Sequence, residues 1–544
     1  MREPYLAPTP ADDEDWHGDD TALARFLSWR LTPAALAALA PRLDALGREA
    51  PRLIDGWARQ ADRELPRLEE DGFVRYDKAY LHLREAARDH RVFTYAWHGG
   101  TRLATFALGY LYAQAESGYY CPACMTDAAA FVLSRHAPHL AADLVPALTQ
   151  DIADGAFEGG MFLTEKTGGS DVGATDTTAV RADDGTWRLT GNKWFASNVD
   201  AQVVLTLARM SPQAEAPGTR GLGLFWLPAR LENGRANPGL RRVSLKDKLG
   251  VRSMATGEVE LDSAHARLVT AAPHGFKVMA EMVNLSRLYN AVASVAIARR
   301  AFREVSKNAT HRQAFGKPLI EHALYRKLVS ELESDVRGAL YFTLDTAATF
   351  DAAFPPHAGA TAKTPAHDQG GDEDEMASAV RLLRALTPMA KATTARLSVS
   401  VASQACEALG GNGYVEDWVT PRLLRDAQVL PIWEGTTNIQ ALDLLRAIHK
   451  DQAHVALADH SRAMLGADAA LRAHWDAWQA EAAQADETSC LRILEMGYHL
   501  RVATLLEVDA ARDGDELATG HAVAYLVRHI ERDVRRWEDL VRPS

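Results

Sequence analysis

The sequence predicts a mainly α-helical protein with a central antiparallel β domain and a helical C-terminal extension. Apolar residues recur at three- and four-residue spacing from about residue 20 to 150, and again after about residue 275. This is the spacing of residues on one helix face. Between about residues 161 and 269 the pattern changes to short β-type runs separated by Gly, Asn, Asp and Pro. With 544 residues, the chain is long enough for three or four domains.

Four domains follow from these patterns in chain order. Repeats such as LTPAALAALAPRLDALGREA predict an N-terminal helical domain over residues 1–158. Runs such as TWRLTGNKWFASN and AQVVLTLARM favour a β domain over residues 159–272. Long patterns such as MAEMVNLSRLYNAVASVAIARRAFREVSKN predict a C-terminal four-helix-bundle domain over residues 273–448. We expect residues 449–544 to form a helical extension.

One segment interrupts the helical pattern. Residues 354–378 are rich in Pro, Gly and acidic residues, so they bury too little apolar surface to offset the entropy lost on ordering. We expect a solvated loop between two helices, with no chemical role.

Composition and charge exclude several classes of protein. The chain is 47% hydrophobic and 24% charged, and 60 Lys+Arg against 72 Asp+Glu give a net charge of −12. This balance argues against a general affinity for phosphate polymers or anionic membranes. The N-terminus lacks the basic and apolar regions of a signal peptide, and no apolar run is long enough for a bilayer. We therefore expect a cytoplasmic protein with no membrane partner.

The cysteines and the glycine-rich motifs exclude further kinds of site. Cys121 and Cys124 form a single CxxC without a second pair at zinc-finger spacing, so two buried thiols are favoured over a redox dithiol or half a metal site. No GxGxxG follows a strand, and GxxxxGK[ST] is absent. These absences weigh against a Rossmann dinucleotide site and a P-loop. No metal site is predicted.

The first candidate segment for ligand binding is MFLTEKTGGSD, residues 161–171. Gly168 and Gly169 allow main chain to approach a ligand closely, and Thr164 and Ser170 supply hydroxyl groups. A simple polar turn is the alternative.

The second candidate segment is EALGGNGYVEDWVTPRLLRD, residues 407–426. Gly410, Gly411 and Gly413 would end a helix and clear space for a flat or phosphorylated group. The alternative is a glycine C-cap followed by a loop.

The third candidate segment is VLPIWEGTTNIQALDLLRAI, residues 429–448. Thr436 or Thr437 can cap the following helix and leave backbone N–H groups pointed toward an anion. Glu434 precedes this helix and is either a functional acid or a surface acid favoured by a helix N-terminus.

Taken in order, these segments resemble the acyl-CoA dehydrogenase family. LTEKTGGSD resembles its first signature, EALGGNGYVEDWVTPRLLRD its second, and IWEGTTNIQ the segment that carries the catalytic glutamate in many members. THRQAFGKPLIEH is similar to a fourth element of the family. The TEKxGGSDV, GxKWF and KDKLG forms, GYYCPACMT and the long extension are most similar to the adaptive-response, AidB-like branch. The resemblance covers most of the chain.

The resemblance implies an acyl-CoA dehydrogenase-like fold and an enzyme of fatty acid metabolism. FAD would lie between the β domain and the C-terminal bundle. Glu434 would remove the α-proton of an acyl-CoA thioester while a β-hydride moves to the flavin. The electrons would then pass to an electron-transferring flavoprotein. Substrate that covers Glu434, in its apolar setting, would raise the basicity of the carboxylate.

The resemblance also transfers roles to individual residues. Ser170 and Arg287 would lie near the acyl-CoA substrate. Arg312 resembles the arginine that reaches the FAD pyrophosphate from a neighbouring subunit, which implies at least a dimer. We expect a homo-oligomer arranged as a dimer of dimers, that is, a homotetramer, while the choice between dimer and tetramer is left open. The residues that match cofactor contacts are Leu163, Thr164, Ser170, Phe195, Ala196, Ser197, Arg312, Phe315, Glu407, Gly410, Gly411, Trp433, Gly435, Thr436 and Asn438.

Three residues depart from the family pattern. Phe162 replaces a small residue, Phe195 a tryptophan, and Ala323 a glutamine that contacts the flavin. These changes affect the expected width of the substrate pocket more than FAD binding. Acyl chain length and branching are left open.

Two other functions stay open at this point. The AidB-like branch is associated with DNA binding, so a DNA-protecting flavoprotein with little turnover is one alternative. Residues 441–544 carry 12 Lys+Arg and 18 Asp+Glu, and this excess of acid disfavours a phosphate-binding surface. An acyl-CoA oxidase, in which oxygen accepts the electrons, is the other alternative.

Overall fold

Two compact units make up the chain in a computed structural model that describes residues 14–151, 153, 155–211, 216–355, 373–465, 469–513 and 516–531. The helical unit comprises Met1–Arg52, Gly100–Gln114 and Asn290–Ser544. The mixed unit comprises Leu53–Gly99 and Ala115–Tyr289. The helix α8 (Gly275–His311) supplies residues to both. The domain boundaries that the sequence suggested, after residues 158, 272 and 448, divide the chain in another way and stay predictions.

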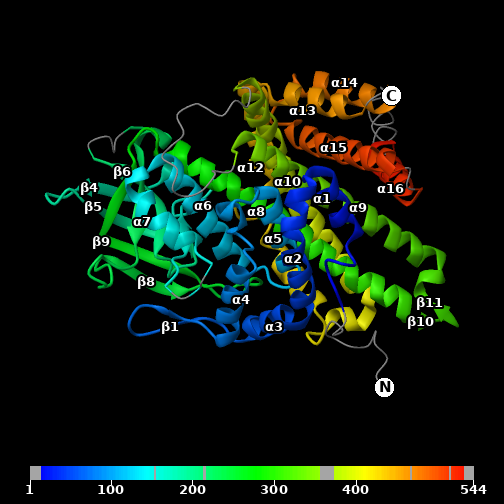
Figure 1. The fold of residues 1–544 in the computed structure, drawn as a ribbon. Helices are drawn as coiled ribbons and strands as arrows, with labels where there is room; N and C mark the ends of the chain where they lie inside the picture. Colours follow the sequence, from blue (N-terminus) through cyan, green and yellow to red (C-terminus); the bar gives the residue numbers. More distant parts are fainter. Residues whose placement is uncertain are drawn as a thin grey trace. The chain divides into compact units, whose positions relative to one another are not determined.

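The mixed unit is built on a seven-stranded sheet (Figure 1). Its strands run in the order β3-β6-β4-β5-β9-β7, β8 pairs with β9, and an added β6–β7 pairing closes five of the strands into a ring. The pairings are antiparallel except those of β3 and β4 with β6. Parallel neighbours need a long connection, and β4 and β5 supply one between β3 and β6. The strands are β3 (Gly159–Phe162), β4 (Thr178–Arg181), β5 (Trp187–Ser197), β6 (Val203–Met210), β7 (Leu222–Pro228), β8 (Leu240–Leu245) and β9 (Thr256–Thr270).

Alternating side chains fill the interior of this sheet. Trp187 and Leu189 of β5 are buried and join a core cluster with Phe162, Phe225 and Val259. This is the two-residue period expected for a strand with one buried face. Lys193 lies in phase with Trp187 and Leu189 and is buried with them. A charge at an inward position requires a partner.

Helices and a short hairpin complete the mixed unit. The helix α6 lies so close to β3 that a Cβ on Gly159 would be 2.4 Å from the Met125 carbonyl oxygen. Cys124 of α6 is buried and Cys121 is half-buried, and neither forms a disulfide. The elements are α3 (Asp55–Arg63), α4 (Lys78–Asp89), η3 (Tyr95–His98), α6 (Tyr120–His136), α7 (Pro138–Thr149), η4 (Val172–Ala174), η6 (Gly218–Gly221), β1 (Arg67–Leu68) and β2 (Val74–Arg75).

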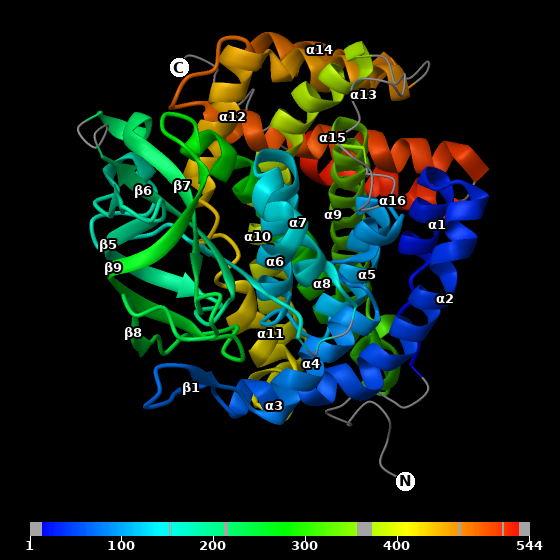
Figure 2. The ribbon, with the colours of Figure 1, turned by 60° about the vertical axis from the view of Figure 1, so that its left-hand side comes forward.

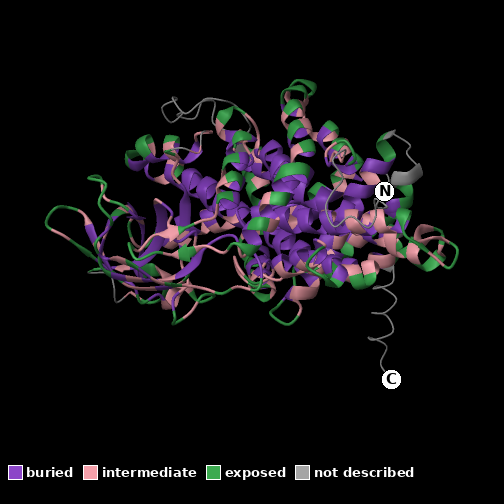
Figure 3. Ribbon diagram, turned by 90° about the horizontal axis from the view of Figure 1, so that it is seen from below, coloured by how far each residue is buried: buried purple, intermediate pink, exposed green. Residues whose placement is uncertain are grey.

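The helical unit contains long helices that pack side by side (Figure 2). Among them, α10 packs against α9, α11, α12 and α13, and α15 packs against α9, α10 and α12. Buried and exposed residues alternate along the helices (Figure 3), as expected for amphipathic segments. The helices are α1 (Thr21–Arg30), α2 (Pro33–Glu49), α5 (Arg102–Ala113), α9 (Ala323–Ala353), α10 (Glu373–Leu409), α11 (Thr420–Ala427), α12 (Thr437–Asp451), α13 (Ala453–Met464), α14 (Ala469–Ala482), α15 (Cys490–Asp513) and α16 (Glu516–Leu526).

Shorter elements join these helices. They are η2 (Ala50–Ile54), where the two units meet in the chain, the hairpin β10 (Gln313–Ala314) and β11 (Lys317–Pro318), η7 (Leu319–Glu321), η8 (Gly410–Tyr414) and η9 (Val527–Glu531). Local capping follows the sequence: Asp20 accepts a hydrogen bond from the Leu23 N–H, and Thr32 accepts one from the Ala35 N–H. Both are preferred N-cap residues.

The loop predicted over residues 354–378 is too long at its C-terminal end. The helix α10 begins at Glu373, so the last six residues of the predicted loop are helical. The acidic residues at this point lie in the first turn of α10, where the helix dipole stabilises negative charge. Residues 356–372, the rest of the predicted loop apart from its first two residues, lie outside the described part of the chain.

The C-terminal extension is helical, as predicted, and packs within the helical unit. Arg501 of α15 and Asp345 of α9 are fully buried, and Arg501 Nη2 lies 2.7 Å from Asp345 Oδ2. Gly338 allows the same two helices to approach, because a Cβ there would be 2.4 Å from a methyl group of Val502. Residues 532–544 lie outside the described residues.

The predicted fold class is confirmed: helices precede and follow a central β region, and further helices complete the C-terminus. Among the described residues, no helix combines the length and apolar character needed to cross a bilayer. The same residues contain no cluster of three or more His, Cys, Asp or Glu side chains that could hold a metal ion.

Candidate active site

Glu434 lies in a turn that immediately precedes α12 in the helical unit. Its φ is +57° and that of Gly435 is +92°, so two consecutive residues adopt the left-handed conformation. Thr436 is the N-cap of α12, but its side chain makes no capping hydrogen bond. The first N–H groups of α12 are therefore not satisfied by this hydroxyl. Glu434 itself is half-buried.

Side chains from three helices hold this turn. Asn290 of α8 donates from Nδ2 to the Leu430 carbonyl at 3.1 Å. Gln440 of α12 donates from Nε2 to the carbonyls of Glu434, at 2.9 Å, and Gly435, at 3.0 Å. Lys391 of α10 donates from Nζ to the Gly435 carbonyl at 2.6 Å. Gln440 and Lys391 are both fully buried, and the sequence did not single out either residue.

Two buried polar atoms beside Glu434 lack a hydrogen-bond partner within the described part of the chain. Neither Trp433 Nε1 nor Gln440 Oε1 has a hydrogen-bond partner among the described residues. A buried donor or acceptor without a partner costs free energy, so such atoms are expected where a ligand supplies the missing partner. They fit a bound polar group at this turn.

The glycine-rich segment follows the end of α10. Gly410 has a φ of +63°, and a Cβ on Gly410 or Gly411 would meet no atom within 4 Å. Gly413 is different, because a Cβ there would lie 2.2 Å from the Cys406 carbonyl oxygen. Gly410 therefore permits the turn, Gly411 leaves open surface, and Gly413 is required by packing. Glu407 is exposed on the last turn of α10.

Arg312 and Phe315 lie at the β10–β11 hairpin, which is tied to this glycine-rich segment. Asn308 Nδ2 donates to the Ala408 carbonyl at 3.1 Å, and the Tyr325 hydroxyl donates to the same oxygen at 3.1 Å. These bonds join the base of the hairpin to the end of α10. Arg312 is exposed, and Phe315 is 97% exposed.

In the mixed unit the structure brings Leu163, Thr164 and Ser170 together after β3. The Thr164 carbonyl accepts a hydrogen bond from the Trp194 N–H at 2.8 Å, which places this segment against β5. A Cβ on Gly169 would be 3.3 Å from Thr164 Oγ1, so the glycine turn folds back onto Thr164. Ser170 is exposed at its end.

The three consecutive residues predicted on β5 point in different directions. Phe195 is 54% exposed, whereas Ala196 is fully buried. Ser197 Oγ lies 3.2 Å from Thr256 Oγ1 of β9. An irregularity in the β5–β9 pairing between Lys193 and Ala196 produces this arrangement. Because the Ala196 side chain is buried, only its main-chain atoms could contact a ligand.

Glu165 and Lys193 form a buried ion pair beneath these residues. Lys193 Nζ lies 2.6 Å from Glu165 Oε1, and both side chains are inaccessible to solvent. Glu165 also accepts hydrogen bonds from the Thr177 hydroxyl, at 2.5 Å, and from the Asp176 N–H, at 2.7 Å. The pair joins the first signature to the GxKWF element. The sequence contained both residues in quoted motifs, but their contact was not predicted.

Burial and ion pairing shift the pKa values of both Glu165 and Lys193. Burial alone would raise the pKa of Glu165, but the Lys193 ammonium and the hydrogen bonds hold it below its usual value. Burial lowers the pKa of Lys193, against the opposing effect of Glu165. Glu165 is therefore held as an acceptor of hydrogen bonds rather than as a proton carrier.

Arg287 lies on α8 in the mixed unit and is buried. Its Nη1 donates to Asn284 Oδ1 at 3.0 Å. The preceding residue, Ser286, is also buried, and its hydroxyl has no hydrogen-bond partner among the described residues.

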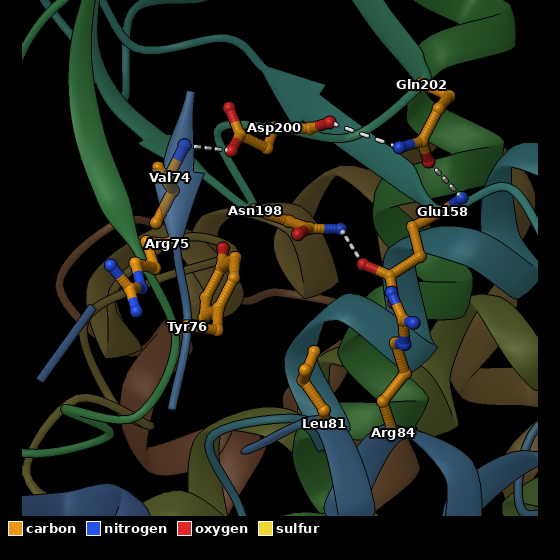
Figure 4. A pocket seen from close by; sticks show the side chains of 9 residues that line it. All are labelled: Val74, Arg75, Tyr76, Leu81, Arg84, Glu158, Asn198, Asp200 and Gln202. Carbon is orange, nitrogen blue, oxygen red and sulfur yellow. Dashed lines mark hydrogen bonds between the residues drawn. The ribbon is translucent and has the colours of Figure 1, made fainter. Parts of the chain in front are cut away.

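A cavity of about 380 Å³ in the mixed unit contains none of the predicted site residues (Figure 4). Its polar atoms bond one another: Asn198 Nδ2 donates to Glu158 Oε2 at 3.1 Å, and the Gln202 side chain accepts from the Glu158 N–H at 2.8 Å. These bonds hold the turn between β5 and β6. The lining residues are Val74, Arg75, Tyr76, Leu81, Arg84, Glu158, Asn198, Asp200 and Gln202.

Three domain families match the chain in the order of its elements. Residues 7–154 match the adaptive response protein AidB N-terminal domain, residues 160–264 the acyl-CoA dehydrogenase middle domain, and residues 273–449 the acyl-CoA dehydrogenase C-terminal domain. The chain is also 34% identical over 447 residues to acyl-CoA dehydrogenase family member 11 of Caenorhabditis elegans. This match covers 79% of the chain and 70% of the relative.

The chain belongs to the acyl-CoA dehydrogenase family. A second relative supports the AidB-like branch of that family: putative acyl-CoA dehydrogenase AidB of Escherichia coli (strain K12) is 35% identical over 69% of the chain and 66% of its own length. The resemblance drawn from the sequence motifs is thereby confirmed.

Solved structures of the acyl-CoA dehydrogenase family share the fold. Caenorhabditis elegans ACDH-11 in complex with C11-CoA has a TM-score of 0.85 at 28% identity, covering 96% of this chain and 91% of that one. An acyl-CoA dehydrogenase from Bacillus anthracis complexed with FAD has a TM-score of 0.70 at 15% identity, covering 97% and 95%. The second likeness concerns the fold alone.

Proposed function

We propose that this member of the acyl-CoA dehydrogenase family is an FAD-dependent α,β-dehydrogenase of acyl-CoA thioesters in which Glu434 is the catalytic base. The observation that carries the proposal is the turn at Glu434. A half-buried carboxylate lies there on a left-handed main chain that side chains of three helices hold. Beside it is the buried indole N–H of Trp433, which has no hydrogen-bond partner among the residues that the structure describes. A charged side chain in a surface role would not need this support.

The residues of the site fit FAD. The Trp433 N–H can donate to a carbonyl or ring nitrogen of the flavin. The N-terminus of α12 at Thr436 and Asn438 can receive a diphosphate, because Thr436 does not cap it. In the mixed unit, Thr164 and Ser170 offer hydroxyls and Phe195 an exposed ring. Leu163, Ala196, Ser197 and Gly435 would contribute main-chain contacts.

In the proposed reaction the chain holds the substrate and moves one proton. Glu434 takes the α-proton of the acyl thioester on a carboxylate oxygen, and the two C–H electrons form the new α,β double bond. When bound, FAD would accept the β-hydride and thereby complete the two-electron oxidation. Ser170 and Arg287 are proposed to contact the acyl-CoA. Exclusion of water around Glu434 favours proton abstraction by strengthening its electrostatic interactions.

A second copy of the chain is proposed to complete the cofactor site. Phe315, Tyr414 and Leu324 of the helical unit are 97%, 87% and 86% exposed, which is a large apolar area for side chains in contact with water. Arg312 at the same hairpin can form a bidentate pair with a diphosphate. In the proposal, Arg312, Phe315, Glu407, Gly410 and Gly411 therefore contact FAD across a subunit interface, in a dimer of dimers.

The proposal is tested with purified, flavin-loaded protein. Anaerobic titration with a panel of acyl-CoAs should bleach the flavin absorbance, and the strongest response identifies the preferred acyl chain. Glu434→Gln should keep flavin bound but reduce the rate of bleaching by about 10² to 10⁴, the usual contribution of a general base. Glu487→Gln, which changes an exposed glutamate of the extension, is the matched control and should bleach at the normal rate.

The outcome of this titration separates the alternatives. A protein that takes up no FAD, or a Glu434→Gln variant that bleaches normally, would contradict the proposal. Hydrogen peroxide formation under aerobic turnover would identify an oxidase, whereas reoxidation by an electron-transferring flavoprotein would identify a dehydrogenase.

A further inference from the structure

The main chain at Glu434 and Gly435 adopts a conformation that a glutamate resists. The φ of Glu434 is +57°, in the left-handed region where the Cβ of an L-residue approaches the following carbonyl. Gly435 continues the left-handed path at +92°. Without support, this pair would relax toward a right-handed or extended conformation, and the Cα–Cβ bond of Glu434 would point in another direction.

Two fully buried side chains satisfy the carbonyl groups of this turn. Lys391 Nζ lies 2.6 Å from the Gly435 oxygen. Gln440 Nε2 lies 2.9 Å from the Glu434 oxygen and 3.0 Å from the Gly435 oxygen. Lys391 comes from α10 and Gln440 from α12, so side chains of two helices hold the turn. Three hydrogen bonds thus converge on two consecutive carbonyl groups.

Gly435 also allows Gln440 to reach the turn. A Cβ at Gly435 would lie 2.8 Å from Gln440 Nε2 and 3.0 Å from a methyl group of Ile439. Any larger residue would therefore displace the amide that binds the turn. Gly435, the Gln440 amide and the Lys391 ammonium together fix the main-chain conformation of the turn. That conformation sets the direction of the Cα–Cβ bond of Glu434.

Burial makes the role of Lys391 specific. A lysine ammonium without water requires hydrogen-bond acceptors, and most lysines on a long helix avoid this cost at the surface. Lys391 instead lies in the middle of α10, and its ammonium reaches the Gly435 carbonyl. A nonpolar residue would fill the same space without the desolvation penalty.

We infer that Lys391 and Gln440 are positioning residues that hold Glu434 in its reactive direction. The inference rests on the proposed role of Glu434 as the base. Neither residue needs to touch the substrate. Because a misplacement of about 1 Å at a reacting group can cost about 10²-fold in rate, loss of either hydrogen-bond donor should slow proton abstraction while substrate affinity changes little.

The test uses the flavin-loaded protein with Lys391→Met and Gln440→Leu, which keep side-chain volume but remove the donors. We expect hydrogen–deuterium exchange at the amides of residues 434–437 to accelerate about tenfold or more. We also expect kcat with the preferred acyl-CoA to fall about 10- to 100-fold, with KM within about twofold of the wild-type value. Lys391→Arg, which retains a cationic donor, should recover part of the lost kcat.

Lys450→Met is the matched control, since Lys450 is exposed in the last turn of α12; it should change neither measurement. If Lys391→Met does not accumulate as folded protein, Gln440→Leu decides alone. Unchanged exchange at residues 434–437 in the folded variants, or a raised KM with normal kcat, would overturn the inference. If wild-type protein itself does not bleach with any acyl-CoA, the proposed function fails, and the exchange measurement still decides whether the two residues hold the turn.

Discussion

Each unit contains a segment of the candidate site that is supported by a fully buried lysine, but the two lysines have different partners. Lys193 in the mixed unit pairs with the carboxylate of Glu165. Lys391 in the helical unit donates to a main-chain carbonyl at Gly435, next to the carboxylate of Glu434. Glu165 is fully buried, whereas Glu434 remains half-buried.

The difference separates a carboxylate that is fully buried in an ion pair from one that is half-buried at a turn whose main chain is held by hydrogen bonds. Glu165 accepts bonds from an ammonium, a hydroxyl and a backbone N–H. These groups favour its ionised form and lower its pKa, which makes it a weaker proton acceptor. In the Glu434 turn the main-chain carbonyls take up the buried donors. The role of a buried lysine near a candidate acid therefore depends on the atom that accepts its hydrogen bond, a carboxylate oxygen or a main-chain carbonyl. Proximity in the sequence does not distinguish these two cases.

The largest expected effect comes from removing the charge of each carboxylate in turn. Glu434→Gln should reduce the rate of flavin bleaching by about 10² to 10⁴. Glu165→Gln should lower the free energy of unfolding, because the Lys193 ammonium loses its ionic partner, but the folded, flavin-loaded protein should bleach at a rate close to normal. Stopped-flow absorbance and chemical denaturation measure the two effects. Equal losses of the bleaching rate in Glu434→Gln and Glu165→Gln would contradict the distinction between a catalytic and a structural carboxylate.

Removing Lys193 should destabilise the mixed unit strongly. Lys193→Met leaves Glu165 buried without its cation, a change that typically costs about 3–5 kcal/mol. Replacing both partners, as in Glu165→Met with Lys193→Met, should recover much of this loss because no charge then remains buried. Urea denaturation of the single and double variants checks the prediction, and a double variant less stable than the single one would contradict it.

Loss of one neutral donor to Glu165 should have a smaller effect. Thr177 is fully buried and its hydroxyl lies 2.5 Å from Glu165 Oε1. Thr177→Val keeps the shape and removes this bond to a charged group, which is worth about 1.5–3 kcal/mol. The neighbouring Thr178 is exposed, so Thr178→Val should stay within about 0.5 kcal/mol of wild type. Thermal unfolding of the two variants provides a direct contrast.

The ion pair of Glu165 and Lys193 should also affect how the free energy of unfolding depends on pH. Because the folded-state pKa of Glu165 lies below its ordinary value of 4.5, its contribution to stability is fully present above about pH 4.5 and is lost as pH falls through the lower folded value. Glu165→Gln should therefore flatten the dependence of unfolding free energy on pH below about 4.5. Denaturant titrations at a series of pH values measure this slope, and an unchanged slope would show that Glu165 is not the group responsible.

The sequence predicted the order of elements well because periodicity depends on local burial. The helical, β and helical regions all appear in the structure, and Glu434 does lie directly before a helix. The predicted loop over residues 354–378 extends too far toward the C-terminus. Acidic residues suggested a solvated segment there, but acidic residues are also favoured in the first turn of a helix. Sequence patterns do not predict strand irregularities. The one in the β5–β9 pairing between Lys193 and Ala196 breaks the alternation of β5, so that Ala196 is buried and Phe195 is exposed.

The missed site residues required contacts between segments far apart in the chain. One signal for Lys193 was present, since it shares the alternation of Trp187 and Leu189 and so had to point inward. Its partner Glu165 could not be chosen among the many acids without a structure. Lys391 gave a weaker signal, as a single cation within ALTPMAKATTA, and its bond to the Gly435 carbonyl depends on how α10 and the turn before α12 meet.

The ion pair between Arg501 and Asp345 has a consequence for how the protein can be shortened. A chain cut after α12 would keep Asp345 in α9 and its ion pair with Arg30 of α1. It would lose the second guanidinium, that of Arg501, along with the Val502 methyl group that packs against Gly338. Such a fragment would expose the apolar face of α9 to water and leave Asp345 with one of its two cationic partners. Expression of a chain that ends after α12 should therefore yield aggregates. The last hundred residues are thus an integral part of the helical unit rather than a separable domain.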